Sequence, residues 1–145
     1  MNSGETATMQ TSIKASTWII SSGILNTENN RIAVDIGDTT GSDVIINAGA
    51  TVISSAYGTG TNAIVSRTGS SLGGVFTLNG TLILSGTTPT IGMSTLNLNG
   101  NVEYNLQGDQ TFLSAINGGA SPNVYNNLII SGSSVKSLTD NTTIN

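Results

Sequence analysis

Short runs of alternating apolar and polar residues recur along the chain, and each run ends in a small polar residue followed by glycine. The pattern appears at Trp18–Gly23, Val44–Gly49, Val75–Gly80 and Thr95–Gly100. Alternation with a period of two is typical of strands that bury one face. A second alternating run follows each glycine, so each occurrence predicts two strands joined at a glycine corner.

Further short apolar runs lie between these occurrences, at Arg31–Ile36, Ala63–Ser66 and Leu128–Ile130. They raise the expectation to about three strands per repeat, a periodicity typical of solenoids. The four glycines are 26, 31 and 20 residues apart, which predicts loops of unequal length. Corners in which Gly or Asn takes a positive φ would join the strands. We therefore expect an all-β fold, a right-handed parallel β-helix (β-solenoid) of about five to six coils.

Two other interpretations of the same pattern stay open. The Asn-Gly pairs at 79–80 and 99–100 also suit two-residue hairpin turns, which would give an antiparallel meander or sandwich. A polar, weakly charged composition also occurs in disordered chains. The additional strand-like runs and the regular Val, Ile and Leu positions favour the β-helix over both.

The two ends of the chain depart from the repeat. We expect residues 17–145 to form a single β-solenoid domain, whereas residues 1–16 form a leader or N-terminal cap. Met9 and Ile13 lie four apart, as on one face of a short helix, and an irregular first coil is the alternative. The last residues continue an alternating strand, so we expect self-association, or pairing with neighbouring repeats of a longer chain, through Thr142, Thr143, Ile144 and Asn145.

Charge and composition narrow the chemistry. Charged residues make up 8% of the 145 residues, the net charge is −4, and the chain holds four basic residues, no Cys and no His. Nucleic acids and anionic lipids require clustered Lys and Arg, so neither is an expected partner. No apolar run is long enough to insert into a membrane, and residues 1–16 lack the pattern of a secretory signal. We expect no enzyme and no catalytic residues.

The C-terminal half contains a recognisable succession of short sequence motifs: Gly100–Asn105, Gln110–Phe112, Tyr125–Gly132 and Lys136–Leu138. It resembles the repeats of long surface and secreted proteins of Bacteroidetes-type bacteria, including adhesin-like proteins exported by the type IX system. Upstream, Gly49–Val52 resembles autotransporter passenger repeats more weakly. The resemblance implies parallel β-helical coils and export to the cell surface or the extracellular space, and it implies no catalytic residues.

Three acidic residues form a candidate calcium site. Asp35, Asp38 and Asp43 lie within nine residues, and carboxylates with loop oxygens are ligands that Ca²⁺ prefers. The spacing matches no EF-hand loop, so a solvated loop is the alternative. Apart from Ca²⁺ we expect no cofactor.

Other polar pairs suggest weaker sites. Glu103 and Asp109 lie six apart and would suit a carbohydrate-cleaving pair only if they converged. Thr-x-Thr pairs raise the possibility of ice or crystal-surface binding, but they occur irregularly, at Thr6/Thr8, Thr59/Thr61 and Thr88/Thr90.

Aromatic side chains are the usual platform for sugar rings. The candidates are Trp18, Tyr57, Tyr104 and Tyr125, of which Trp18 and Tyr104 lie within strand patterns and suit the core. Tyr57, between Ala56 and Gly58, is the surface-binding candidate.

The sequence thus predicts a non-catalytic structural or adhesive β-solenoid segment of an extracellular bacterial surface protein or fibre, able to assemble end to end. A carbohydrate-binding β-helix module is the alternative, followed by a carbohydrate-cleaving or ice-binding one.

Overall fold

The computed structural model describes residues 2, 4–34, 43–58, 62–67, 74–113, 123–138 and 142–145. Within these ranges the chain is all-β with almost no helix, and its strands pair in parallel. The strands are β1 (Thr6–Thr8), β2 (Ile13–Ala15), β3 (Trp18–Ile20), β4 (Gly23–Glu28), β5 (Ile32–Val34), β6 (Val44–Ile46), β7 (Ala50–Ser54), β8 (Val65–Arg67), β9 (Val75–Leu78), β10 (Thr81–Leu84), β11 (Ile91–Gly92), β12 (Thr95–Tyr104), β13 (Gln110–Thr111), β14 (Asn123–Ile130), β15 (Lys136–Ser137) and β16 (Thr142–Ile144).

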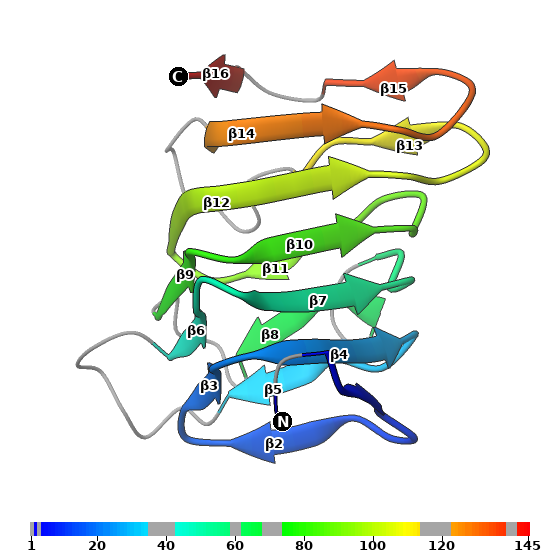
Figure 1. Cartoon of the computed structure of the whole chain (residues 1–145). Helices are drawn as coiled ribbons and strands as arrows, with labels where there is room; N and C mark the ends of the chain where they lie inside the picture. Colours follow the sequence, from blue (N-terminus) through cyan, green and yellow to red (C-terminus); the bar gives the residue numbers. More distant parts are fainter. Residues whose placement is uncertain are drawn as a thin grey trace.

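Strands from successive repeats stack in columns, with the two chain termini at opposite ends of the stack (Figure 1). Column A consists of β3, β6, β9, the first parts of β12 and β14, and β16. Column B consists of β1, β4, β7, β10 and the later parts of β12 and β14. Because β12 and β14 run through both columns, A and B form one curled sheet.

A third column and a separate pair of strands complete the arrangement. Column C consists of β2, β5, β8 and β11. β13 pairs with β15 in a two-stranded sheet of its own. Every pair among the described strands is parallel, so the antiparallel meander considered from the Asn-Gly pairs is wrong.

The core lies between the columns and is built from alternating positions of each strand. In column B the register brings Val52, Leu82 and Val102 into one line, and all three are fully buried. The intervening positions point outward, as the period of two requires. Burial of each such side chain contributes about 1.5–3 kcal/mol to folding, so each repeat stabilises the one stacked on it.

Glycines mark the corners between columns A and B, for two different reasons. Gly49 has φ +87°, a conformation that glycine adopts without strain, as the sequence predicts. Gly100 does not have a positive φ. A Cβ at Gly100 would instead lie 2.0 Å from the carbonyl oxygen of Gly80 in the neighbouring repeat. Glycine is therefore needed at Gly100 because two stacked backbones approach closely.

The short helix considered near the N-terminus is not formed. Thr6–Thr8 forms β1 and Ile13–Ala15 forms β2, and the amide of Met9, between them, donates to the Asn26 carbonyl at 2.8 Å. Pairing with β4 and β5 satisfies backbone groups along this segment, so it outweighs a local four-residue spacing. The division of the chain at residue 16 stays a prediction.

Candidate functional site

The feature that stands out in the described residues is the C-terminal face of the stack, formed by the later part of β14, by β15 and by β16. Ile130 continues the line of Leu84 and Tyr104 in column B, and Ile144 continues the line of Leu98 and Tyr125 in column A. Below the face these lines are buried, whereas Ile130 and Ile144 are 53% and 60% exposed. Leu138, which follows β15, is 58% exposed. The face thus presents side chains of core type to solvent.

Strand edges accompany these apolar side chains. Among the described strands, β16 pairs only with β14, and the later part of β14 pairs only with β12. Within the described residues, each therefore has a paired strand on one edge only. Edges of this kind pair with further strands unless they are covered or charged.

An aromatic cluster forms the floor of the C-terminal face. The rings of Tyr104 and Phe112 stack with centroids 4.4 Å apart, and Tyr125 lies edge-on to both at 6.4 Å. The Tyr104 and Tyr125 hydroxyls are 2.8 Å apart, and the amide of Leu113 donates to the Tyr104 hydroxyl at 2.8 Å. These contacts join β12 and β14 to the segment that follows β13.

Burial changes the acidity of both tyrosines. It raises the pKa of Tyr104 far above its usual value, and the neighbouring Tyr125 adds to the effect. Burial also raises the pKa of Tyr125 to about 12, against the opposing effect of the hydrogen bond with Tyr104. Both phenols are therefore neutral, hydrogen-bonded core groups. The sequence treated Tyr125 as a possible sugar platform, which is wrong because its side chain is fully buried.

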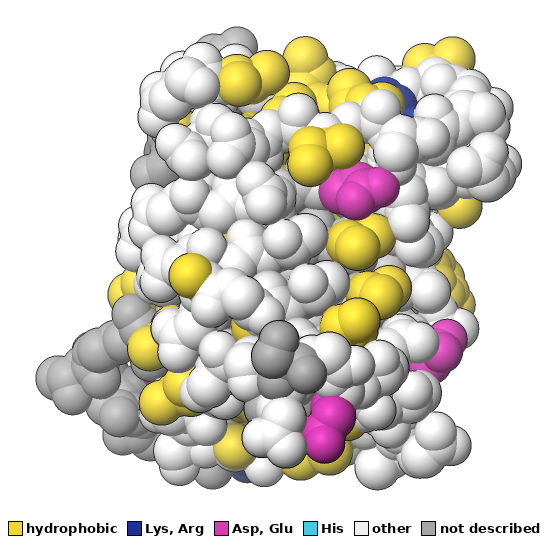
Figure 2. Space-filling view, in the orientation of Figure 1, with side chains coloured by type: hydrophobic (Ala, Val, Ile, Leu, Met, Phe, Trp, Pro, Cys, Tyr) yellow, Lys and Arg dark blue, Asp and Glu magenta, His cyan; other side chains and the backbone are white. Residues whose placement is uncertain are grey.

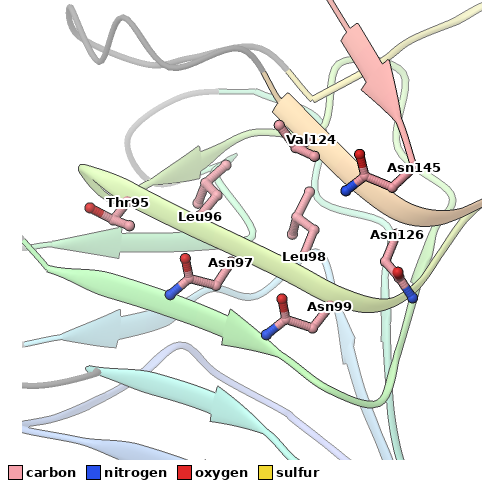
Figure 3. A pocket seen from close by; sticks show the side chains of 8 residues that line it. All are labelled: Thr95, Leu96, Asn97, Leu98, Asn99, Val124, Asn126 and Asn145. Atoms are coloured by element: carbon pink, nitrogen blue, oxygen red, sulfur yellow. The ribbon is translucent and has the colours of Figure 1, made fainter.

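A shallow groove of about 400 Å³ opens beside the C-terminal face, between column A and the last residue. Figure 3 shows Leu96 and Leu98 on the side of β12 nearer Val124, with Asn97 and Asn99 on the other side. The complete lining is Thr95, Leu96, Asn97, Leu98, Asn99, Val124, Asn126 and Asn145. The side chains that line the groove are therefore uncharged, and they combine apolar groups with amides and a hydroxyl.

The opposite, N-terminal face is more closed. Met9 and Ile20 are only 5% and 4% exposed. Trp18 is half-buried, and its indole N–H donates to the Ala33 carbonyl at 3.2 Å. Ile13 is in register with the buried Ile32, but its own side chain at this face is 45% exposed. Trp18 is thus a packing residue rather than a sugar platform.

Outward positions of column B form a second apolar feature. Ile53, Ile83, Glu103 and Ile129 lie in register on neighbouring strands. Figure 2 shows this face as a line of hydrophobic side chains interrupted by one acidic side chain. The Ile53 and Ile83 side chains are half-buried, so the line is a ridge within a mostly polar surface.

The predicted calcium residues are only partly described. Asp35 and Asp38 lie outside the described residues. Asp43 is 3% exposed, and its carboxylate accepts the amide of Val75 at 3.0 Å. It therefore ties the start of β6 to the start of β9. Within the described ranges no group of three or more His, Cys, Asp or Glu is placed to hold a metal, and the calcium site stays a prediction.

The two carboxylates considered for carbohydrate cleavage each bond to a neighbouring repeat. Glu103 accepts a hydrogen bond from the Ser131 hydroxyl. Asp109 accepts the amide of Val135 at 3.1 Å. Both side chains therefore connect the last repeat to the one below it.

The threonine pairs also differ from one another. The hydroxyls of Thr88 and Thr90 donate to the carbonyls of Tyr57 and Gly58. Thr6 and Thr8 are exposed on β1, and Thr59 and Thr61 lie outside the described residues. The two described pairs, Thr6/Thr8 and Thr88/Thr90, therefore do not form one continuous row of threonines.

The remaining predicted positions are at the surface. Tyr57 is 51% exposed, and its role in surface binding stays a prediction. Thr142–Ile144 forms β16, and the amide of Asn145 donates to the Tyr125 carbonyl at 3.0 Å. The sequence pointed to these four residues from the unfinished strand pattern. It missed Ile130 and Leu138, which only the stacking register places on the same face.

Comparisons of this chain with protein-family models, with curated proteins and with solved structures find no match. In the part of the chain that the structure describes, no helix has both the length and the apolar character required to cross a membrane.

Proposed function

We propose that the chain is a right-handed parallel β-helix of about five to six coils that serves as a non-catalytic structural segment. The observation that carries the proposal is the repeated order of the strands. The chain passes from column A to B to C and back to A through β3, β4, β5 and β6, and it repeats this path with β6, β7, β8 and β9. A right-handed path is the expected one because connections between parallel strands of one sheet are almost always right-handed.

Ladders of polar side chains support a role as a rigid segment. The amides of Asn99 and Asn101 donate to Asn79 and Thr81 in the repeat below, at 3.2 and 3.3 Å. Asn97 makes a similar, longer contact of 3.5 Å with Thr77. Each outward rung adds a bond between repeats to those of the backbone ladder, which suits a rod that resists bending and proteolysis.

The location and the adhesive role belong to the same proposal. We infer a place in an extracellular protein or fibre of the bacterial cell surface from the resemblance of residues 100–138 to exported surface repeats. Hydrogen bonds of Glu103 and Asp109 to neighbouring repeats favour a structural rather than a catalytic use of these carboxylates.

Single-molecule pulling tests the structural role. The chain is held through cysteines introduced at Asn2 and Asn145, near the two ends of the stack. A rod is expected to keep a fixed short extension at low force and to release its length only after unfolding. The matched control, Leu82→Asp, places a charge in the core and is expected to extend at low force. Extension of the unaltered chain like an unfolded polymer would overturn the proposal.

One observation favours a second candidate, a carbohydrate-binding module. The groove beside Asn145 combines Leu and Val side chains with amides, the mixture that binds neutral hydroxylated ligands. A glycan array probed with and without Ca²⁺ tests it, together with a reducing-sugar assay for cleavage. Binding that is lost in Asn126→Ala but kept in Asn105→Ala, outside the groove, would support this candidate. An array without signal removes it.

A further inference from the structure

We propose that the C-terminal face binds the N-terminal face of a second copy of this chain, head to tail, so that columns A and B continue from one copy into the next. The inference rests on the proposed β-helix and names its partner. In the joined state, β1 of the second copy pairs with the later part of β14, and β3 pairs with β16.

The first support is the matching geometry of the two faces. Column A begins with β3 and ends with β16, and column B begins with β1 and ends with the later part of β14. At the N-terminal face the chain runs through column B, then C, then A. At the C-terminal face it likewise runs through column B before column A. Both columns contain the same number of described strands. The height difference between columns A and B is therefore the same on both faces. A second copy then fits without a gap in either column.

The second support is the register of the side chains. In column B the line of Val102 and Leu128 would continue with Ala7, which is in register with Leu25 in its own copy. In column A the line of Tyr125 and Ile144 would continue with Ile20. Core-type residues meet at these two positions, whereas the same register brings Thr142 opposite Trp18. The exposed Ile130 and Ile144 become buried.

The third support is the low charge of the two faces. Glu5, near the N-terminal face, accepts hydrogen bonds from Asn2. Lys136, near the C-terminal face, donates to the carbonyls of Leu106 and Gly108 at 2.7 and 3.0 Å. These charges are thus already engaged within each copy. A heterologous contact that repeats in this way produces filaments rather than closed dimers.

Column C does not take part in the joint. The C-terminal strand β15 pairs with β13, and neither pairs with β11 at the end of column C. The contact between copies is therefore carried by columns A and B.

Sedimentation velocity and electron microscopy over a wide range of concentration test the inference. The unaltered chain is expected to elongate into rods of the width of one copy as concentration rises. Ile130→Lys places a charge in the joint, where burial of an unpaired charge is costly, and should raise the concentration needed for elongation at least ~10-fold. Ile144→Lys is a second variant of the same face. Both positions are exposed, so these copies are expected to fold, which circular dichroism verifies.

The matched control is Ile129→Lys. Ile129 neighbours Ile130 on the same strand and is 41% exposed, but it points outward, in register with Glu103. This variant is expected to elongate like the unaltered chain. Equal loss of elongation in Ile129→Lys and Ile130→Lys would overturn the inference.

Mixing two variants separates head-to-tail joining from joining of like faces. Ala7→Lys alters the N-terminal face in column B and Ile130→Lys alters the C-terminal face, so each is expected to be monomeric alone and to form pairs, and nothing longer, when mixed; circular dichroism verifies that both variants fold. Dimers of Ala7→Lys alone would show that C-terminal faces pair with each other, which contradicts the inference. An unaltered chain that stays monomeric at every concentration also contradicts it. If that chain still behaves as a rod in the pulling experiment, the structural proposal stands while the inference fails.

Discussion

The line of Leu84, Tyr104 and Ile130 runs from a middle repeat to the C-terminal face, and burial changes along it. The register is unbroken, yet Leu84 and Tyr104 are fully buried whereas Ile130 is 53% exposed. The sequence supplies an apolar residue at each step, and only the presence or absence of a strand above decides whether it is covered. The middle of the stack and its end therefore follow the same pattern but differ in how far it is buried.

The N-terminal face shows that an end of the stack need not be left so open. There Met9 and Ile20 are nearly buried, and Trp18 bonds to the Ala33 carbonyl. The C-terminal face has a large aromatic cluster below it but exposes Ile130, Leu138 and Ile144 above. The difference between the two faces indicates that the C-terminal one gains more from a contact.

The largest expected difference between the middle and the end comes from truncating a core side chain. Leu84→Ala leaves a cavity between stacked repeats and should lower the free energy of unfolding by about 2–5 kcal/mol. Ile130→Ala, in the same line, should lower it by less than about 1 kcal/mol, because its side chain is half exposed. Denaturant unfolding at a concentration where the chain is monomeric measures both. Equal losses would contradict an uncovered C-terminal face.

A smaller effect is expected from the hydroxyl of Tyr104. Tyr104→Phe removes the acceptor of the Leu113 amide and the partner of the Tyr125 hydroxyl, which should cost about 1–3 kcal/mol. Tyr57→Phe, at an exposed site, is the control and should change stability by no more than about 0.5 kcal/mol. Denaturant unfolding of the two variants decides whether the cluster secures the last repeats. No difference between them would show that it does not.

The same cluster predicts a loss of stability in alkaline solution. The pKa of Tyr125 is about 12 in the folded chain and about 10 in the unfolded chain, so the folded state holds its proton more tightly. Stability from this group is complete below about pH 10 and falls by up to about 1.4 kcal/mol per pH unit between about pH 10 and 12. The raised pKa of Tyr104 acts in the same direction. Denaturant unfolding across this range measures the slope, and a flat profile would contradict burial of the phenols.

The smallest expected difference lies in the outward ladder. The half-buried Asn101 donates to Thr81, so Asn101→Ala should cost about 0.5–1 kcal/mol. Asn127 occupies the next rung at the exposed end, and Asn127→Ala should change stability by less than about 0.5 kcal/mol. Thermal unfolding of the two variants compares the rungs. A larger loss of stability in Asn127→Ala than in Asn101→Ala would contradict the expectation that the middle of the stack is held more tightly than its end.

Much of the strand layout was predictable from the alternation of side chains. The runs ending at Gly23, Gly49 and Gly80 predicted strands that the structure contains, because a period of two survives as long as one face is buried. The all-β class and the parallel pairing were predicted as well. The role of Gly100 was not, because close approach of two backbones depends on a repeat distant in sequence.

The candidate site was predictable only in part. The unfinished strand pattern pointed to Thr142–Asn145, whereas Ile130 and Leu138 became visible through the register of stacked strands. The joining of Tyr104, Phe112 and Tyr125 also depends on the pairing of β12 with β14, which no local sequence pattern predicts. The helix expected from Met9 and Ile13 was wrong for a related reason. Pairing of this segment with β4 and β5 outweighs the helical spacing of four between these two residues.

Amide hydrogen exchange at low and high protein concentration tests the central proposal. The C-terminal face is uncovered in the single chain and becomes covered when a second copy binds. At low concentration we expect fast exchange in β16 and the later part of β14, and slow exchange in β7 and β10. At high concentration, protection should rise in β14 and β16 and, in parallel, in β1 and β3, while β7 stays unchanged. Protection of β14 and β16 that equals that of β10 at low concentration, or that does not respond to concentration, would contradict the account.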